Sequence, residues 1–409
     1  MSTRVSVLSR YKVLPDLAGA AFLPLGLLAR LPLAMLTVGT LTLVAVESAS
    51  YALAGVAAGA VGIGSAIGAP ILGALADRAG QKKVLLIAAA LNTVAVTAVV
   101  LAALSLSAAN SGDQAGGAVV VAALLSGLTT PQVGPFARAR WMGLTEGRTL
   151  RALELDAALS YEGTADELTF VLGPALVGLL GAGIAPWLPL STAAFLTATF
   201  VTAFALHPTA SAVRPIPRHE LPAVTLREWS IVLVPVAAMV AMGTFFGGTQ
   251  AALTAFAGEH GSPDLAGLLY AALGLTSAVA ALSVAVWPPA FGLRLRWAVC
   301  AGCMLVFSLS LFAPHGLTWM TGALLLVGIP VGPIMVTVFG IGGRIAPRGR
   351  TGTVMTALAS GIVAGTALGA AIGGQLAARG GTAAALWAPV AAAGALLALG
   401  AGAAVVRRR

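Results

Sequence analysis

Four ionisable residues interrupt long apolar stretches. Arg30 lies mid-way through LGLLARLPLAML, and Glu162, Asp166 and Glu167 lie in YEGTADELTFVLG. A charge inside a membrane span costs about 2.5–3.5 kcal/mol on insertion scales, so its presence indicates a role. Glu162 and Asp166 share a helix face, and Glu167 is turned by about 100° from Asp166. Because burial and a nearby arginine together govern carboxyl protonation, we predict that all four residues serve proton coupling or substrate binding. There are two alternatives. Arg30 and one acid could form a structural pair that orients the bundle, or Glu162 could lie near the cytoplasmic mouth and be solvated.

The composition indicates which elements hold these charges. Of 409 residues, 58% are hydrophobic and 9% are charged, whereas soluble proteins carry about 25% charged residues. Apolar runs of roughly 20 to 28 residues are long enough to cross about 30 Å of hydrocarbon as helices. We therefore predict an all-α polytopic membrane protein with twelve spans. Their expected ranges are 18–45, 51–75, 83–106, 115–137, 152–182, 186–206, 229–256, 264–287, 296–314, 317–341, 351–377 and 383–406.

The basic residues predict the orientation of these spans. Apart from Arg30 and Arg379, every lysine and arginine falls at a terminus or in an alternate connection, from Arg4 to the C-terminal Arg407, Arg408 and Arg409. The pairs Arg138/Arg140 and Arg294/Arg296 are assigned to such connections. By the positive-inside rule both termini are cytoplasmic, in a multi-pass protein of the cell (inner, cytoplasmic) membrane. The net charge of +9 is then topological, and no nucleic-acid partner is expected.

One long connection divides the chain. The stretch 207–228 contains four prolines and mixed charges, which exclude a membrane span. We expect a six-helix bundle at 1–206, a cytoplasmic linker at 207–228 and a second six-helix bundle at 229–409.

A short basic, glycine-rich turn joins the second and third runs. It reads Gly73-Ala-Leu-Ala-Asp77-Arg78-Ala-Gly80-Gln81-Lys-Lys. This turn resembles the signature loop of major facilitator superfamily transporters, G-x-x-x-D-R-x-G-R-K-x, with Gln81 as the one departure. The resemblance implies two six-helix bundles that rock about a substrate site near mid-membrane.

The resemblance also implies a role for this turn. Gly73 allows close helix approach, and the Asp77 carboxylate can cap the exposed N–H groups of a helix N-terminus. In the family that terminus belongs to the eleventh span, here near Thr351 to Thr353. We therefore expect a conformational latch made of Gly73, Asp77, Arg78 and Gly80. A solvated loop that serves topology only is the alternative.

The partner of Arg78 is not evident from the sequence. In many relatives it is an acid at the end of the fourth span, but here that end reads PFARARWM. Glu146 and Glu154 are the possible substitutes.

The fifth span continues as Gly173-Pro174-Ala-Leu-Val-Gly178. It partly resembles the G-P-x-x-G-G motif of the drug and metabolite:proton antiporter branch, in which the bend seals a helix interface. We interpret it as an indication of antiport and export, with an ordinary proline kink as the alternative.

Candidates for the cavity wall come from both halves. They are the polar residues Asn92, Gln250 and Tyr270 and the aromatic residues Phe246 and Phe339. Each polar residue could instead form only a helix–helix hydrogen bond. Since the second half carries no charge inside an expected span, we predict an amphipathic cavity that suits a partly hydrophobic molecule.

Other chemistry is disfavoured. The sequence has no G-K-[ST] phosphate loop, no metal-ligand spacing among its four histidines and no serine-nucleophile motif in a suitable context. We expect no enzyme activity, cofactor or metal. The predicted function is proton-coupled export of a small amphipathic molecule by alternating access, by a monomer in the bilayer whose partners are that molecule and protons. A proton-linked metabolite importer, a lipid-handling flippase of the same fold and a non-transporting sensor remain alternatives.

Overall fold

The computed structural model describes residues 10–108, 113–216, 220, 223–262, 265–288, 290–313 and 316–405. Within these ranges the chain is helical and contains no β-strand. Among the described residues, eleven helical segments are long and apolar enough to cross a membrane, and a shorter apolar helix spans Trp387–Gly402. The predicted all-helical class with twelve apolar segments is confirmed. The basic residues Arg4, Arg218 and Arg407 to Arg409 lie outside the described residues.

The helices before the central connection form one group. They are α2 (Val13–Ala18), α3 (Phe22–Leu28), α4 (Leu31–Ser48), α5 (Tyr51–Ala79), α6 (Gln81–Ala108), α7 (Asp113–Leu128), α8 (Val133–Leu144), α9 (Arg151–Gly183), α10 (Leu188–Leu196), the π-helix η1 (Thr197–Val201) and α11 (Thr202–Leu206).

The helices after it form the second group. They are α12 (Leu226–Glu259), α13 (Ala266–Ser283), η4 (Val284–Val286), α14 (Leu293–Ser308), η5 (Leu309–Phe312), α15 (Leu317–Ile345), α16 (Thr351–Ala385) and α17 (Trp387–Val405). A 3₁₀ turn, η2 (Pro208–Ala212), lies in the connection.

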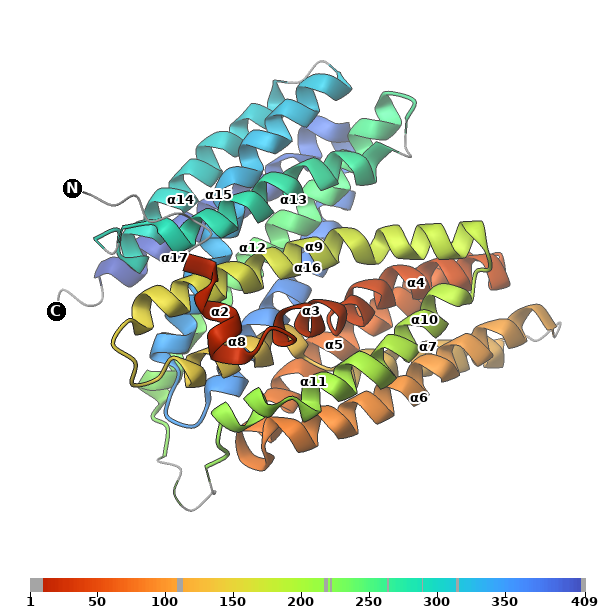
Figure 1. The fold of residues 1–409 in the computed structure, drawn as a ribbon. Helices are drawn as coiled ribbons and strands as arrows, with labels where there is room; N and C mark the ends of the chain where they lie inside the picture. The colour runs from red at the N-terminus through yellow and green to blue at the C-terminus, as the bar shows by residue number, and fades with distance from the viewer. Residues whose placement is uncertain are drawn as a thin grey trace.

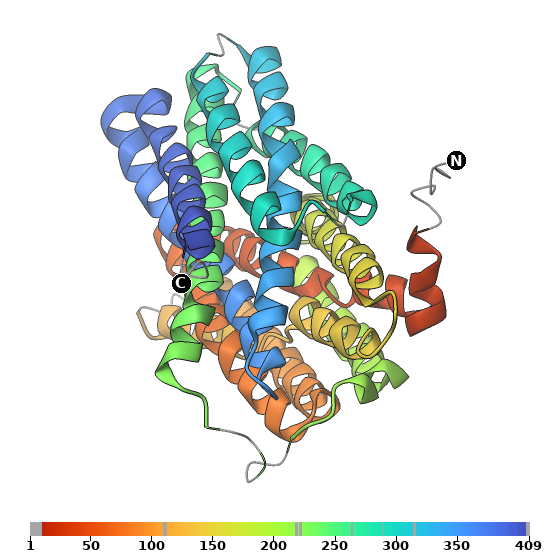
Figure 2. The same cartoon turned by 90° about the vertical axis from the view of Figure 1, so that its left-hand side faces the viewer.

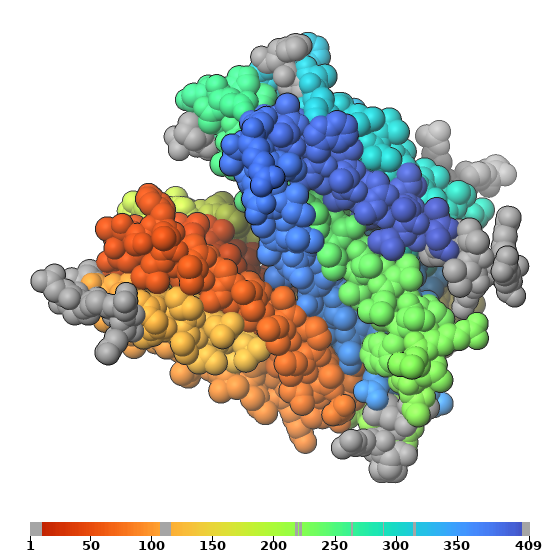
Figure 3. All heavy atoms as spheres, turned by 180° about the vertical axis from the view of Figure 1, so that it is seen from behind, coloured from red at the N-terminus to blue at the C-terminus, as the bar shows by residue number. Residues whose placement is uncertain are grey.

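The two groups lie side by side, with α9 along the seam between them (Figure 1, Figure 2). α9 packs against α13 and α15 of the second group, and α16 packs against α5 and α8 of the first. Seen from behind, the blue α16 runs beside the green α12 and reaches the orange helices of the first group (Figure 3). That the halves move as two units stays a prediction.

Glycine explains how closely some of these helices pack. In the α12–α16 pair, a β-carbon at Gly369 would lie 2.8 Å from the backbone nitrogen of Gly248, and one at Gly247 would lie 2.7 Å from that of Ala370. Both glycines therefore let the two backbones touch, as membrane helices often require. Many outward-facing side chains are apolar, among them Val94, which is 69% exposed. Such a surface suits lipid rather than water.

The expected spans 18–45 and 115–137 are present, at Phe22–Ser48 and Gly116–Leu144, but the helix is interrupted within each. The first is divided into α2, α3 and α4, and the α3–α4 break falls at Ala29 and Arg30. The fourth breaks between α7 and α8, where Pro131 lacks an N–H group and Gln132 is non-helical at φ −90° and ψ 63°. α8 then continues the segment to Leu144.

Three arginines that the sequence assigned to connections are buried within helices. Arg138 and Arg140 of α8 and Arg296 of α14 are 2%, 0% and 3% exposed. α8 packs against α9, α16 and the connection, so its arginines lie inside protein rather than in solvent. Arg296 lies in the first turn of α14, at the edge of the expected span 296–314.

Candidate functional site

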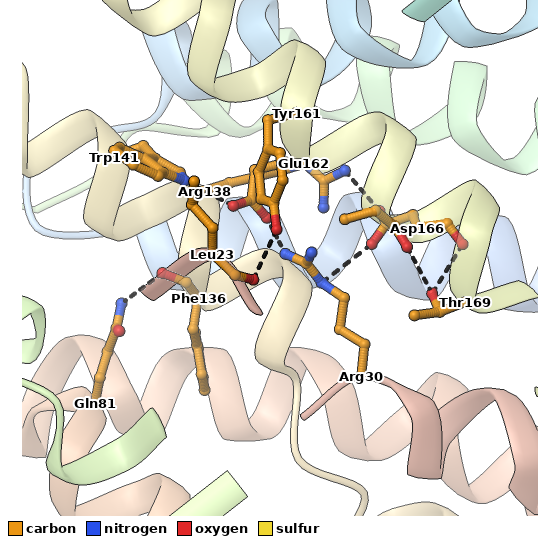
Figure 4. A network of polar contacts seen from close by, with 11 residues as sticks. Leu23, Arg30, Gln81, Phe136, Arg138, Trp141, Tyr161, Glu162, Asp166 and Thr169 are labelled. Atoms are coloured by element: carbon orange, nitrogen blue, oxygen red, sulfur yellow. Dashed lines mark hydrogen bonds and ion pairs between the residues drawn. The ribbon is translucent and has the colours of Figure 1, made fainter. Parts of the chain in front are cut away.

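Four charged side chains meet in the first group of helices. α9 supplies Glu162 and Asp166 one turn apart, and Arg30 precedes the first turn of α4 (Figure 4). Arg30 donates through Nη2 to Glu162. The Trp141 indole donates to the other oxygen of Glu162 at 2.6 Å. Glu162 is 1% exposed, which contradicts the alternative that it is solvated.

The second acid of the cluster, Asp166, is shared by two arginines. Arg138 donates from Nη2 to Oδ2 at 2.6 Å, and Arg30 Nε lies 3.3 Å from Oδ1. Gly134, in the first turn of α8, makes room, because a β-carbon there would lie 3.2 Å from both Arg30 Nε and Asp166 Oδ1. Two guanidinium groups thus balance two carboxylates, as a buried ionic cluster requires.

Sequence reasoning missed Arg138. The local signal was weak, because Phe136, Trp141 and Met142 surround the two arginines of PFARARWM but polar residues follow from Thr145. A fourth span extended to Leu144 would have placed this arginine inside the membrane segment.

A narrow cavity with about 70 Å³ of room for water-sized molecules lies against this cluster. Arg30, Arg138 and Asp166 form part of its wall, and Met335 and Phe339 of α15 face them from the second group. The Arg138 guanidinium carbon lies 4.0 Å from the centroid of the Phe339 ring, a cation–π contact between the two groups. The predicted combination of charged and apolar walls is therefore present.

Glu167 points away from this cluster and toward α13. Its Oε1 accepts a hydrogen bond from Ser277 Oγ at 2.7 Å, and a β-carbon at Gly274 would lie 3.9 Å from its Oε2. Tyr270 lies close enough to interact electrostatically with it. Over the described ranges Glu167 forms no ion pair. It is a 7% exposed acid at the seam between the groups.

Asp77 caps α16, the contact that the signature loop led us to expect. Its carboxylate accepts hydrogen bonds from the Gly352 nitrogen at 2.8 Å and from the Thr353 nitrogen and hydroxyl, both at 2.7 Å. At Gly73 a β-carbon would lie 2.8 Å from the Gly352 carbonyl oxygen, so this glycine permits the approach. Gly80 ends α5 with φ +90°, a conformation that favours glycine. The role of these residues as a latch stays a prediction.

Arg78 is exposed, and one of its two suggested partners is already engaged. Glu154 accepts from Arg148 Nε at 2.7 Å and from Nη2 at 2.9 Å. This hydrogen bonding raises the pKa of the Arg148 guanidinium. Glu146 is exposed.

An ion pair also joins the two groups near the start of α9. Arg296 Nη1 of α14 lies 2.9 Å from Asp156 Oδ2, and Arg296 Nε also donates to the Phe291 carbonyl. The sequence indicated arginines in this connection but not their partner. Asp77 lies near the turn between α5 and α6, and Asp156 lies near the connection between α8 and α9. Alternate connections of a chain of spanning helices lie on the same side, so both contacts hold the same end of the seam, here called the Asp77 end.

Buried Arg140 fastens the central connection to the first group. It donates to Gln81 Oε1 at 2.9 Å, to the Phe204 carbonyl at 2.9 Å and to Thr209 Oγ1 at 3.0 Å. Burial, together with this guanidinium, holds the pKa of His207 below its usual range. The imidazole is therefore neutral at neutral pH.

The other residues that we expected at the cavity wall lie in different surroundings. Phe339 lines the cavity, whereas Phe246 packs on Phe245 with ring centroids 6.1 Å apart, and Gln250 is exposed. Asn92 donates to the Ser126 carbonyl at 2.7 Å, which makes it a helix–helix contact between α6 and α7.

The glycine–proline segment of α9 forms one close contact. A β-carbon at Gly173 would lie 2.9 Å from the carbonyl carbon of Ala34 in α4, whereas one at Gly178 would meet nothing within 4 Å. α9 continues as one helix through Pro174. Only the first glycine of the motif therefore lies at a helix interface.

Solved structures of similar fold are transporters. The human organic anion transporter MFSD10 (TETRAN) aligns with a TM-score of 0.70 and 18% identity, over 93% of this chain and 97% of that chain. A bacterial homologue of the iron transporter ferroportin, in an outward-facing state with soaked iron, aligns with a TM-score of 0.68 and 16% identity, over 94% and 98%. At these identities the likeness concerns the fold. No curated protein matches the sequence.

The family itself is established by sequence. The model of the Major Facilitator Superfamily matches residues 22–361, which include the Asp77 loop, the charge cluster and most of the helices of both groups. The chain therefore belongs to the major facilitator superfamily, and it is a membrane transporter rather than an enzyme.

Proposed function

We propose that this transporter exports a small amphipathic molecule in exchange for protons, by alternating access. The observation that carries the proposal is Glu167, a buried carboxyl group at the seam between the two helix groups that has no cationic partner among the described residues. Burying a carboxylate without a counter-ion is costly, so binding a proton is the direct way to relieve that cost.

The charge cluster supports the choice of Glu167 over its neighbours. Glu162 and Asp166 are already matched by Arg30 and Arg138. Removing the charge of either acid by protonation would leave an arginine uncompensated. Among the described residues no arginine pairs with Glu167, so its protonation leaves no cation uncompensated. Its hydrogen-bond partner Ser277 belongs to the other half. Movement at the seam would therefore change the surroundings of Glu167 directly.

The positions of the latch and the cavity support alternating access. The cavity residues Ser65 and Ser360 lie roughly 12–18 Å along their helices from Asp77 and Gly352. Contacts of Asp77 and of Asp156 hold the Asp77 end together. If the basic connections lie in the cytoplasm, this arrangement is closed to the cytoplasm, and the cavity serves the release of substrate to the outside.

Transport in inside-out membrane vesicles tests the proposal. With an acidic lumen, a panel of small amphipathic compounds is screened for uptake that is accompanied by release of lumenal protons. We expect at least one compound to accumulate, and Glu167→Gln to abolish the drive by the pH gradient while substrate-for-substrate exchange persists. Glu228→Gln, which changes an exposed acid at the start of α12, is the matched control.

Each other outcome decides against the proposal. Accumulation that is equal with and without the pH gradient would exclude proton coupling. Accumulation only when the outer solution is acidic would favour the proton-linked importer. A Glu167→Gln protein with an unchanged response to the gradient would remove Glu167 from the proton path.

A further inference from the structure

The charge of the cavity wall differs from the charge of the cluster behind it. Arg30, Arg138 and Asp166 line the cavity, whereas Glu162 is not part of its wall and lies behind Arg30 and Trp141. The four-residue cluster is neutral, but the part that a bound molecule would meet carries two positive charges and one negative charge.

Both arginines of the wall retain unused hydrogen-bond donors. In the described part of the protein, Arg30 Nη1 and Arg138 Nε are buried and have no hydrogen-bond partner. The residues are 4% and 2% exposed. A guanidinium carries five N–H donors in a planar fork that matches the oxygens of a carboxylate. Donors left unmatched at a buried wall favour a molecule that brings acceptor oxygens.

The rest of the wall is apolar. Phe170 lies on the first-group side, and Met335, Phe339 and Ile362 lie on the second-group side. A molecule that reaches the arginines would therefore place any remaining part against these side chains. Burial of apolar surface there would add to the affinity.

We propose that the cargo of this cavity is an organic monoanion, with one carboxylate held by Arg30 and Arg138 and an apolar body held against α15 and α16. This assignment rests on the proposed transport function and narrows its substrate. A single negative charge neutralises the wall while Asp166 keeps its two ion pairs. A cation meets like charge, and a neutral amide leaves the wall charged.

A monoanionic cargo changes the driving force of export. Exchange of protons for a monoanion moves positive charge inward and negative charge outward, so both movements transfer charge in the same sense. Export is then driven by the membrane potential as well as by the pH gradient. A neutral cargo exchanged for one proton would move only half that charge.

Three matched probes test the assignment on the wild-type protein. Octanoate, octylamine and octanamide share one apolar chain and differ in the charge of the head group. Binding to the purified full chain is measured by calorimetry at constant pH, where no proton gradient exists. We expect octanoate to bind at least tenfold more tightly than either of the other two. Equal binding, tighter binding of the amine or amide, or no binding of octanoate overturns the proposal.

Variants locate the binding site. Arg138→Gln is expected to lower the affinity for octanoate at least tenfold and to abolish the preference for octanoate over octanamide. Arg379→Gln, an exposed arginine in α16, is the matched control and should leave both unchanged. Phe339→Ala is expected to weaken all three probes without changing their order, and it provides a readout if Arg138→Gln does not fold. Retention of the octanoate preference in folded Arg138→Gln overturns the site, and so does loss of the preference in Phe339→Ala.

This test is separate from the test of export. A protein that prefers octylamine and is still driven by a pH gradient would overturn the anion assignment and leave the exporter proposal intact. A protein that prefers octanoate but shows no response to a pH gradient would overturn the exporter proposal and leave the anion assignment intact.

Discussion

The acids on two faces of α9 have opposite electrostatic surroundings. Toward α4 and α8, Glu162 and Asp166 are matched by two arginines. Toward α13, Glu167 meets the neutral hydroxyl of Ser277. Asp166 and Glu167 are adjacent in sequence, yet one holds the first group together and the other lies where the two groups meet. The matched charges stabilise a fixed arrangement, whereas the single acid can gain or lose its charge without leaving a buried partner uncompensated.

The largest effect is expected at the matched face. Glu162→Gln would leave Arg30 with one carboxylate to share with Arg138, and breaking a buried ion pair from one side costs about 3–5 kcal/mol. The free energy of unfolding in detergent should fall by that amount. The double variant Arg30→Met/Glu162→Met should lose less than the sum of its single variants. Strict additivity would show that the pair is not coupled, and the contrast between the faces would fail.

An intermediate effect is expected at the Asp77 end. Asp77→Asn keeps one acceptor oxygen but loses the charge that faces the first turn of α16, which is worth about 1–2 kcal/mol. A change of this size shifts a two-state equilibrium about 5- to 30-fold. The two states are the Asp77 end closed and the Asp77 end open. The rate at which a thiol reagent added from the Asp77 end labels the cysteine of Ser360→Cys, a cavity position, should therefore rise by the same factor. Unchanged labelling would show that the cap does not control access.

The smallest effect on stability is expected at the unmatched face. Glu167→Gln retains an acceptor for Ser277 and removes no ion pair, so the free energy of unfolding should change by less than about 1 kcal/mol. Its effect should appear in the pH dependence of transport instead. A loss as large as that of Glu162→Gln, measured in the same detergent, would mean that the two faces do not differ.

Particular residues show how far sequence reasoning reached. Asp77 and the helix that donates hydrogen bonds to it were predictable, because the signature loop is local and its partner follows from the family. Arg30 and Glu162 were recognised as charges in apolar runs, but their pairing was one option among several. Arg138 was assigned to a connection, although it lies in α8. The helix breaks after α7 and begins again after Pro131, so the fourth span ends later in the chain than its hydropathy indicates.

The sequence by itself determined the class of the protein, its apolar spans and the resemblance at Asp77, because hydropathy and short motifs are properties of neighbouring residues. Only the tertiary structure decided which charges are matched. Arg30 and Glu162 are 132 positions apart and Glu167 and Ser277 are 110 apart. Whether such residues meet depends on how each helix is rotated and where it is interrupted, and a rotation of 100° separates Asp166 from Glu167. That rotation places one acid among arginines and the other at the seam between the halves.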